Sequence, residues 1–125
     1  RTPYLINSSR GEVVDTASLL ASLAAGKVKD VVIDTWENEP RISRDLLEAA
    51  FLATPHIAGY SADGKANATR MSLEALCRFF GMEVELEITP PEGPSDYDPT
   101  RDSEWLKADP EKFEWFRGNY PIRRE

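Results

Sequence analysis

The sequence has few of the features that mark disulfide-stapled or membrane-spanning proteins. It contains one cysteine, Cys77, so no internal disulfide can form and a reducing compartment is the simplest expectation. No apolar run approaches the length of a membrane span, and no segment resembles a signal peptide. We therefore expect a soluble, cytoplasmic chain without a membrane partner, in which Cys77 is a buried small hydrophobe.

Positive charge is also scarce. The chain has 15 lysines and arginines against 22 acidic residues, which gives a net charge of -7. Binding to nucleic-acid phosphates needs clustered basic residues, so we exclude nucleic acid as the main partner. We also predict no metal site.

The length and the two ends suggest an incomplete protein. With 125 residues, 41% of them hydrophobic, the chain has room for one modest domain or for parts of two. It opens without methionine in a strand-like segment and stops in a charged run. We expect a piece of something longer.

Three short apolar runs, each followed by a helical pattern, predict an α/β fold. Strands are expected at 4–7, 31–33 and 51–53. Helices are expected from a cap at Asp15 or Thr16 to a stop at Gly26, after a cap at Ser43, and from Ser61 or Ala62 to about Phe80. This order implies right-handed parallel crossovers in one sheet, and the run at 31–33 is typical of a strand covered on both faces.

The character of the chain changes after Gly81. Residues 83–88 alternate and predict a half-exposed strand, 90–94 form a linker, and Pro110 marks a helix start. Four aromatic residues then lie close together, at positions 113, 115, 116 and 120. They either cover a core or dock onto another subunit, and both interpretations remain open. We predict one domain over 1–81 and the start of a second over 82–125.

The only histidine, His56, lies just after the third strand, and imidazole is well suited to proton transfer near pH 7. Arg10 and Asp34 follow the first two strands, and active-site residues of parallel sheets gather at such strand ends. Glu39 lies in the segment after Asp34. We therefore consider these four residues together.

Each of the four also has an ordinary structural interpretation. Arg10 either binds a carboxylate through its planar fork or pairs with Asp15 or solvent. Asp34 either accepts a hydrogen bond from a ligand or caps a turn, and Glu39 either orients His56 or is a plain loop residue. His56 either transfers protons or is buried at a strand end with its nitrogens bonded to the backbone. Taken jointly, the set suits oxidation of a 2-hydroxy acid, in which the hydride needs an acceptor that no side chain supplies.

Three ordered blocks, at residues 5–15, 32–40 and 54–59, resemble the D-isomer-specific 2-hydroxyacid dehydrogenases. The resemblance implies a catalytic, substrate-binding Arg10, an acid/base His56 and a catalytic Glu39 paired with it. It also implies NAD as cofactor, with contacts from Ser8, Ser9, Arg10, Asp34 and Gly59. The fold implied is the C-terminal part of a Rossmann-like parallel sheet.

The block at 59–66, with Tyr60 directly after the glycine, is similar to family members that act on a phosphorylated 2-hydroxy acid. By this similarity Tyr60 contacts the substrate. Residues 97–102 and 113–125 resemble the start of an extra, small α+β dimerisation domain, which implies a homodimer.

The chain departs from the family pattern by what is missing. No two glycines stand two apart, so the Gly-x-Gly-x-x-Gly turn that receives a pyrophosphate is absent, as is the substrate-binding lobe. We therefore predict that the chain has no activity by itself. The alternatives are another 2-hydroxyacid dehydrogenase, such as one acting on 3-phosphoglycerate, and a non-catalytic dimerisation module.

Overall fold

The computed structural model describes residues 3–83, 85, 87–94 and 98–124. They form two compact units, each described here by itself. The first, the sheet unit, comprises residues 1–58 and 98–120; the second, the long-helix unit, comprises residues 59–97 and 121–125. The domain boundary predicted after residue 81 stays a prediction.

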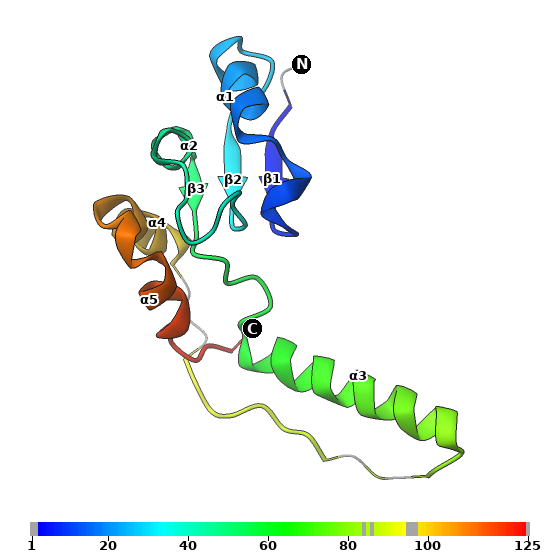
Figure 1. Ribbon diagram of the computed structural model, residues 1–125. Coiled ribbons are helices and arrows are strands. Elements are labelled where there is room, and N and C mark those ends of the chain that lie inside the picture. The colour runs from blue at the N-terminus through cyan, green and yellow to red at the C-terminus, as the bar shows by residue number, and fades with distance from the viewer. Residues whose placement is uncertain (1–2, 84, 86, 95–97, 125) are drawn as a thin grey trace. The chain divides into compact units, whose positions relative to one another are not determined.

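The sheet unit is built on three parallel strands in the order β1-β2-β3 (Figure 1). They are β1 (Leu5–Asn7), β2 (Val31–Ile33) and β3 (Leu52–Ala53), with Asn7 opposite Ile33 and Ile33 opposite Ala53. The predicted α/β class and all three strands are confirmed. Because the strands are parallel, the loops that follow them emerge at the same edge of the sheet.

Two helices connect these strands, and both begin where the sequence predicts. A 3-10 turn (Gly11–Val13) precedes α1 (Thr16–Ala24), whose N-cap Asp15 accepts a hydrogen bond from the Ser18 amide at 2.7 Å. The helix α2 (Arg44–Ala49) has Ser43 as its cap. The helices α1 and α2 contact each other, so both crossovers cover the same face of the sheet.

Within the sheet unit, one face of the sheet is covered by helices. Apolar side chains of β2, β3, α1 and α2 form the buried core on that face, including Val31, Ile33 and Leu47. On the other face Ile6 is 72% exposed, and Val32 and Leu52, which lie beside it in register, are only half-buried. The expectation that both faces are covered is therefore not met within the sheet unit, where no described element packs against the second face.

The segment after residue 97 returns to the sheet unit. It forms α4 (Pro99–Ala108), a 3-10 turn (Pro110–Lys112) and α5 (Phe113–Gly118). The structure confirms the helical start at Pro110, whereas α4 was missed although Asp98 and Pro99 supply a cap and a first-turn proline.

Of the tail aromatics, Phe113 is fully buried in the core and Phe116 packs against it, whereas Trp115 is exposed. The core interpretation thus holds for Phe113 and Phe116. In addition, α4 packs against β3, where the Ser103 hydroxyl accepts a hydrogen bond from the Ala53 amide at 3.1 Å. A side chain from the tail therefore pairs with one backbone amide at the edge strand β3.

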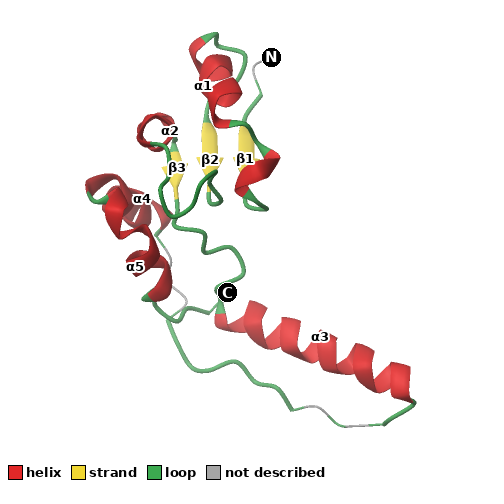
Figure 2. Cartoon of the chain, viewed as in Figure 1, coloured by secondary structure: helices red, strands yellow, loops and turns green. Residues whose placement is uncertain are grey.

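The long-helix unit consists of α3 (Ala62–Phe80) and the irregular segments beside it (Figure 2). Ser61 caps the start of α3, and Gly81 ends it at a φ of 63°, as predicted. Arg124 donates two hydrogen bonds of 2.8 Å to Asp63, and this contact raises the pKa of the guanidinium. None of the helices in the described residues is long and apolar enough to cross a membrane.

Two expectations for this unit are not met. Residues 83, 85, 87 and 88 lie in no strand, and the remaining residues of the predicted strand, Val84 and Leu86, lie outside the described residues, as do Tyr97 and Glu125. Cys77 is only half-buried, so the expectation of a buried small hydrophobe is not met.

Candidate functional site

The loops that leave β1, β2 and β3 enclose a hollow of about 240 Å³ in the sheet unit. It brings together three of the predicted site residues, Arg10, Glu39 and His56. The rest of its lining comes from the same loops, namely Gly11, Glu12, Trp36, Glu37 and Asn38. Residues up to 46 positions apart in the sequence therefore share one small space.

His56 and Glu39 form a hydrogen-bonded pair within this hollow. Nδ1 of the imidazole lies 2.8 Å from Oε2 of Glu39, and each side chain is 19% exposed. The other carboxylate oxygen, Oε1, accepts the amide of Trp36 at 2.8 Å. Because a carboxylate only accepts hydrogen bonds, this geometry favours the tautomer with the proton on Nδ1 and the lone pair on Nε2.

Arg10 is exposed, and the backbone of its loop is fixed by a hydrogen bond from a buried side chain. The buried side chain of Asn7 donates to the Arg10 carbonyl at 3.0 Å, while Nη1 of Arg10 donates to the Ser9 carbonyl at 2.6 Å. Asp15, the structural partner considered for Arg10, instead caps α1. Arg10 therefore lines the hollow, and its guanidinium forms no ion pair with a carboxylate of the described residues.

Gly11 places this loop directly against the loop after β2. A Cβ atom at Gly11 would lie 2.0 Å from the carbonyl oxygen of Trp36, which is far inside van der Waals contact. The glycine is thus required by the close approach of two backbones rather than by its own dihedral angles.

Asp34 lies beneath the hollow rather than in its lining. It is 6% exposed, and its carboxylate accepts three hydrogen bonds from the segment after β3. Oδ1 accepts the hydroxyl of Thr54 at 2.6 Å and the amide of Ile57 at 2.8 Å, and Oδ2 accepts the amide of Ala58 at 3.0 Å. The predicted contact of Asp34 with the cofactor stays a prediction.

The remaining predicted residues are divided between the two units. Ser8 and Ser9 are exposed in the loop after β1, and Ser9 donates its hydroxyl to Asn7 at 3.1 Å. Gly59 and Tyr60 belong to the long-helix unit, where Nζ of Lys65 lies 4.4 Å from the centroid of the Tyr60 ring. Their predicted contacts with cofactor and substrate therefore stay predictions.

Sequence reasoning missed the buried polar residues that hold the loops. Asn7 bridges the first two loops, since its side chain also donates to the Thr35 carbonyl at 3.3 Å. Trp36 donates Nε1 to the Thr54 carbonyl at 3.0 Å, and Glu37 accepts the Thr16 amide at 2.7 Å. The available signal was the position of these side chains at the last residue of an apolar strand, as for Asn7, or within a few residues of a strand end, as for Trp36 and Glu37.

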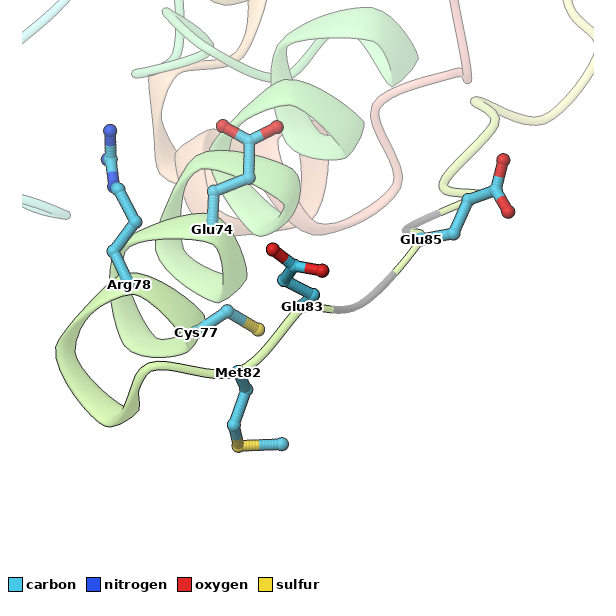
Figure 3. A pocket seen from close by; sticks show the side chains of 6 residues that line it. All are labelled: Glu74, Cys77, Arg78, Met82, Glu83 and Glu85. Atoms are coloured by element: carbon cyan, nitrogen blue, oxygen red, sulfur yellow. The ribbon is translucent and has the colours of Figure 1, made fainter.

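A second hollow, of about 580 Å³, lies beside the end of α3 in the long-helix unit (Figure 3). Its lining includes Cys77, Arg78 and the carboxylates of Glu74, Glu83 and Glu85, and none of the predicted site residues. The described residues contain no cluster of His, Cys, Asp and Glu arranged to hold a metal ion. The candidate site is therefore the hollow of the sheet unit.

Comparison with known proteins agrees with this location. Residues 1–58 match the family described as D-isomer specific 2-hydroxyacid dehydrogenase, NAD binding domain. These residues include all three strands and every predicted site residue except Gly59 and Tyr60.

Curated relatives match nearly the whole chain. An erythronate-4-phosphate dehydrogenase of Bacteroides fragilis is 55% identical over 97% of the chain, and one of Bacteroides thetaiotaomicron is 52% identical over all of it. The chain spans 39% and 40% of the length of these two relatives.

Among solved structures, the holo D-mandelate dehydrogenase of Rhodotorula graminis is similar, with a TM-score of 0.54 and 26% identity. That match covers 73% of this chain and 29% of the other.

Proposed function

Because the chain belongs to the D-isomer specific 2-hydroxyacid dehydrogenase family, we propose that it is part of an NAD-dependent erythronate-4-phosphate dehydrogenase. The reaction is oxidation of 4-phospho-D-erythronate at carbon 2, which yields 2-oxo-3-hydroxy-4-phosphobutanoate. The observation that carries the proposal is the His56–Glu39 pair, which shares one hollow with Arg10.

His56 is proposed as the acid/base of this reaction. Glu39 keeps the proton on Nδ1, so that Nε2 presents a lone pair and takes the proton of the carbon-2 hydroxyl. The resulting imidazolium lies 2.8 Å from a carboxylate, which stabilises the charge that develops during the step. Glu39 thereby acts as orienter and as counter-charge.

Arg10 is proposed to bind the substrate carboxylate. A guanidinium offers two parallel N–H donors that match a carboxylate in a bidentate geometry. Holding the carboxylate fixes the neighbouring carbon 2 relative to His56, and such positioning is a large part of catalysis. Tyr60 is proposed as a further substrate contact.

The residues present fit one end of a nicotinamide cofactor. The hollow lies at the carboxyl edge of parallel strands, where such sheets bind ligands, and the exposed Ser8 and Ser9 adjoin it in sequence. When bound, NAD supplies the hydride acceptor. We propose that Ser8, Ser9, Arg10, Asp34 and Gly59 contact it, whereas this sequence contains no glycine-rich turn for the pyrophosphate.

The proposed pathway follows from the names of the relatives, and the proposed inactivity of the chain follows from its missing glycine-rich turn. We propose a role in pyridoxal 5'-phosphate biosynthesis, a cytoplasmic location and a homodimeric parent enzyme. We further propose that the 125-residue chain alone is inactive, because it spans only about two fifths of its curated relatives.

The test is substitution of His56 in the parent enzyme. His56→Ala is expected to lower kcat by about 10²–10⁴-fold, the usual contribution of a general acid or base. The dissociation constant for NAD, measured by fluorescence titration, is expected to change little. Turnover near that of the wild type would overturn the proposed role.

Glu39→Gln is the companion variant, because the amide retains the shape of the side chain but not its charge. It is expected to lower kcat while leaving NAD binding intact.

Turnover of 4-phospho-D-erythronate should exceed that of 3-phosphoglycerate, and the reverse preference would contradict the substrate assignment. NAD titration and sedimentation of the isolated chain test whether it acts only as a dimerisation module.

A further inference from the structure

The carboxylate of Asp34 is directed into the protein rather than toward the hollow. It accepts hydrogen bonds of 2.6–3.0 Å from the hydroxyl of Thr54, which precedes the histidine, and from the amides of Ile57 and Ala58, which follow it. A buried carboxylate is costly unless several donors surround it, and these three donors satisfy most of its acceptor sites. The group that the carboxylate holds is therefore the segment that carries His56.

His56 itself has an unusual backbone conformation. Its φ is 54°, in the left-handed region that residues with a side chain rarely adopt. Such a conformation persists only where the surrounding structure imposes it. The hydrogen bonds of Asp34 fix the backbone directly after His56, and its bond to Thr54 anchors the residue two positions before.

A second connection runs through the loop that Asp34 begins. The amide of Trp36 holds Glu39, and the indole of Trp36 holds the carbonyl of Thr54. Glu39 in turn pairs with His56. The loop after β2 thus contacts the loop after β3 on both sides of the histidine. In each of these contacts, the group from the loop after β2 belongs to residues 34–39.

From this arrangement we propose that Asp34 is the positioning residue of the site. Its carboxylate anchors the Thr54 side chain before His56 and the backbone amides of Ile57 and Ala58 after it, and so holds Nδ1 within hydrogen-bonding distance of Glu39 before any ligand binds. The catalytic consequence rests on the proposed function, but the positioning itself is a property of the chain without cofactor.

The single histidine makes the proposal measurable in the 125-residue chain. Its imidazole nitrogens give one set of ¹⁵N signals, which report the tautomer directly. In the wild type at neutral pH we expect the form protonated at Nδ1 to dominate. In Asp34→Asn an amide N–H₂ replaces one acceptor and opposes an N–H donor, so we expect that dominance to be lost.

Two further variants keep the result interpretable. Thr54→Val removes one donor to Asp34 at nearly constant volume, and it is expected to shift the imidazole signals in the same direction by a smaller amount. Asp45→Asn changes an exposed aspartate in the first turn of α2 and should leave the signals unchanged. If Asp34→Asn fails to fold, as judged by amide dispersion, Thr54→Val decides.

The proposal is overturned if a folded Asp34→Asn chain keeps the wild-type tautomer, or if Thr54→Val leaves the imidazole signals unchanged. In the parent enzyme, Asp34→Asn should lower kcat. If Asp34 only contacted NAD, Asp34→Asn would instead weaken NAD binding and would leave the imidazole signals of the ligand-free protein unchanged. Since the tautomer is read without substrate, an inactive parent enzyme would refute the proposed function and not the positioning role.

Discussion

The sheet unit and the long-helix unit differ in what they bury. Every residue of the core cluster found among the described residues lies in the sheet unit, and it includes the fully buried Phe113 contributed by the tail. In the long-helix unit, α3 leaves several apolar side chains mostly exposed, namely Met71, Leu76, Phe79 and Phe80. Local contacts such as the Ser61 cap hold α3, whereas tertiary packing holds the sheet.

This difference explains where the candidate site is found. A proton-transfer pair needs fixed distances, and side chains are fixed best when packing and hydrogen bonds restrict the backbone that carries them. The hollow with Arg10, Glu39 and His56 is built entirely by loops of the sheet unit. The contrast between packed and locally held structure yields three predictions.

The largest effect is expected for a matched pair of phenylalanines. Phe113→Ala in the sheet unit should lower the free energy of unfolding by about 3–5 kcal/mol, because it removes a fully buried ring and leaves a cavity. Phe79→Ala in α3 should change it by less than about 0.5 kcal/mol, because that ring is 81% exposed. Urea denaturation followed by far-UV circular dichroism measures both, and equal losses would abolish the contrast.

An intermediate effect is expected where two site loops touch. Gly11→Ala should cost roughly 1–3 kcal/mol, because its Cβ would meet the Trp36 carbonyl oxygen at 2.0 Å. Gly118→Ala, at the end of α5, serves as the control, because a Cβ atom there would have no other atom within 4 Å. The same denaturation experiment applies, and a neutral Gly11→Ala would mean that the loops do not approach as closely as described.

The smallest effect distinguishes the caps of α1 and α3 by their response to pH. The hydrogen bonds from Ser18 lower the pKa of Asp15, so its contribution to stability is complete above the usual carboxyl pKa of about 4 and is lost as pH falls through the lower folded value. Asp15→Asn keeps an acceptor but cannot titrate. The stability difference between wild type and Asp15→Asn should therefore shrink with acid.

The cap of α3 provides the comparison. Ser61→Ala should cost about 1 kcal/mol at every pH, because a hydroxyl cap carries no charge. Hydrogen exchange of the first-turn amides of α1 and α3, recorded between about pH 6 and about pH 3, separates the two cases. A pH-independent difference for Asp15→Asn would contradict the assigned cause.

Several features could be predicted because their causes are local. The strand 31–33 is a continuous apolar run, Ser43 and Asp15 are favoured caps, and Gly81 adopts the left-handed conformation that ends α3. The expected strand over 83–88 shows the opposite case. Its alternation would suit pairing with a neighbouring strand, yet residues 83, 85, 87 and 88 lie in no strand, and pattern alone does not provide the partner.

The sequence by itself determined the succession of strands and helices along the chain, the caps of the helices and the presence of one histidine after a third strand. Those features depend on neighbouring residues and on residue type. Only the tertiary structure decided that Asp34 points inward to the His56 segment and that Phe113 fills the core beside β3. Each of these contacts joins positions at least 20 residues apart, and the partner is selected by how the elements pack and which buried donors need acceptors.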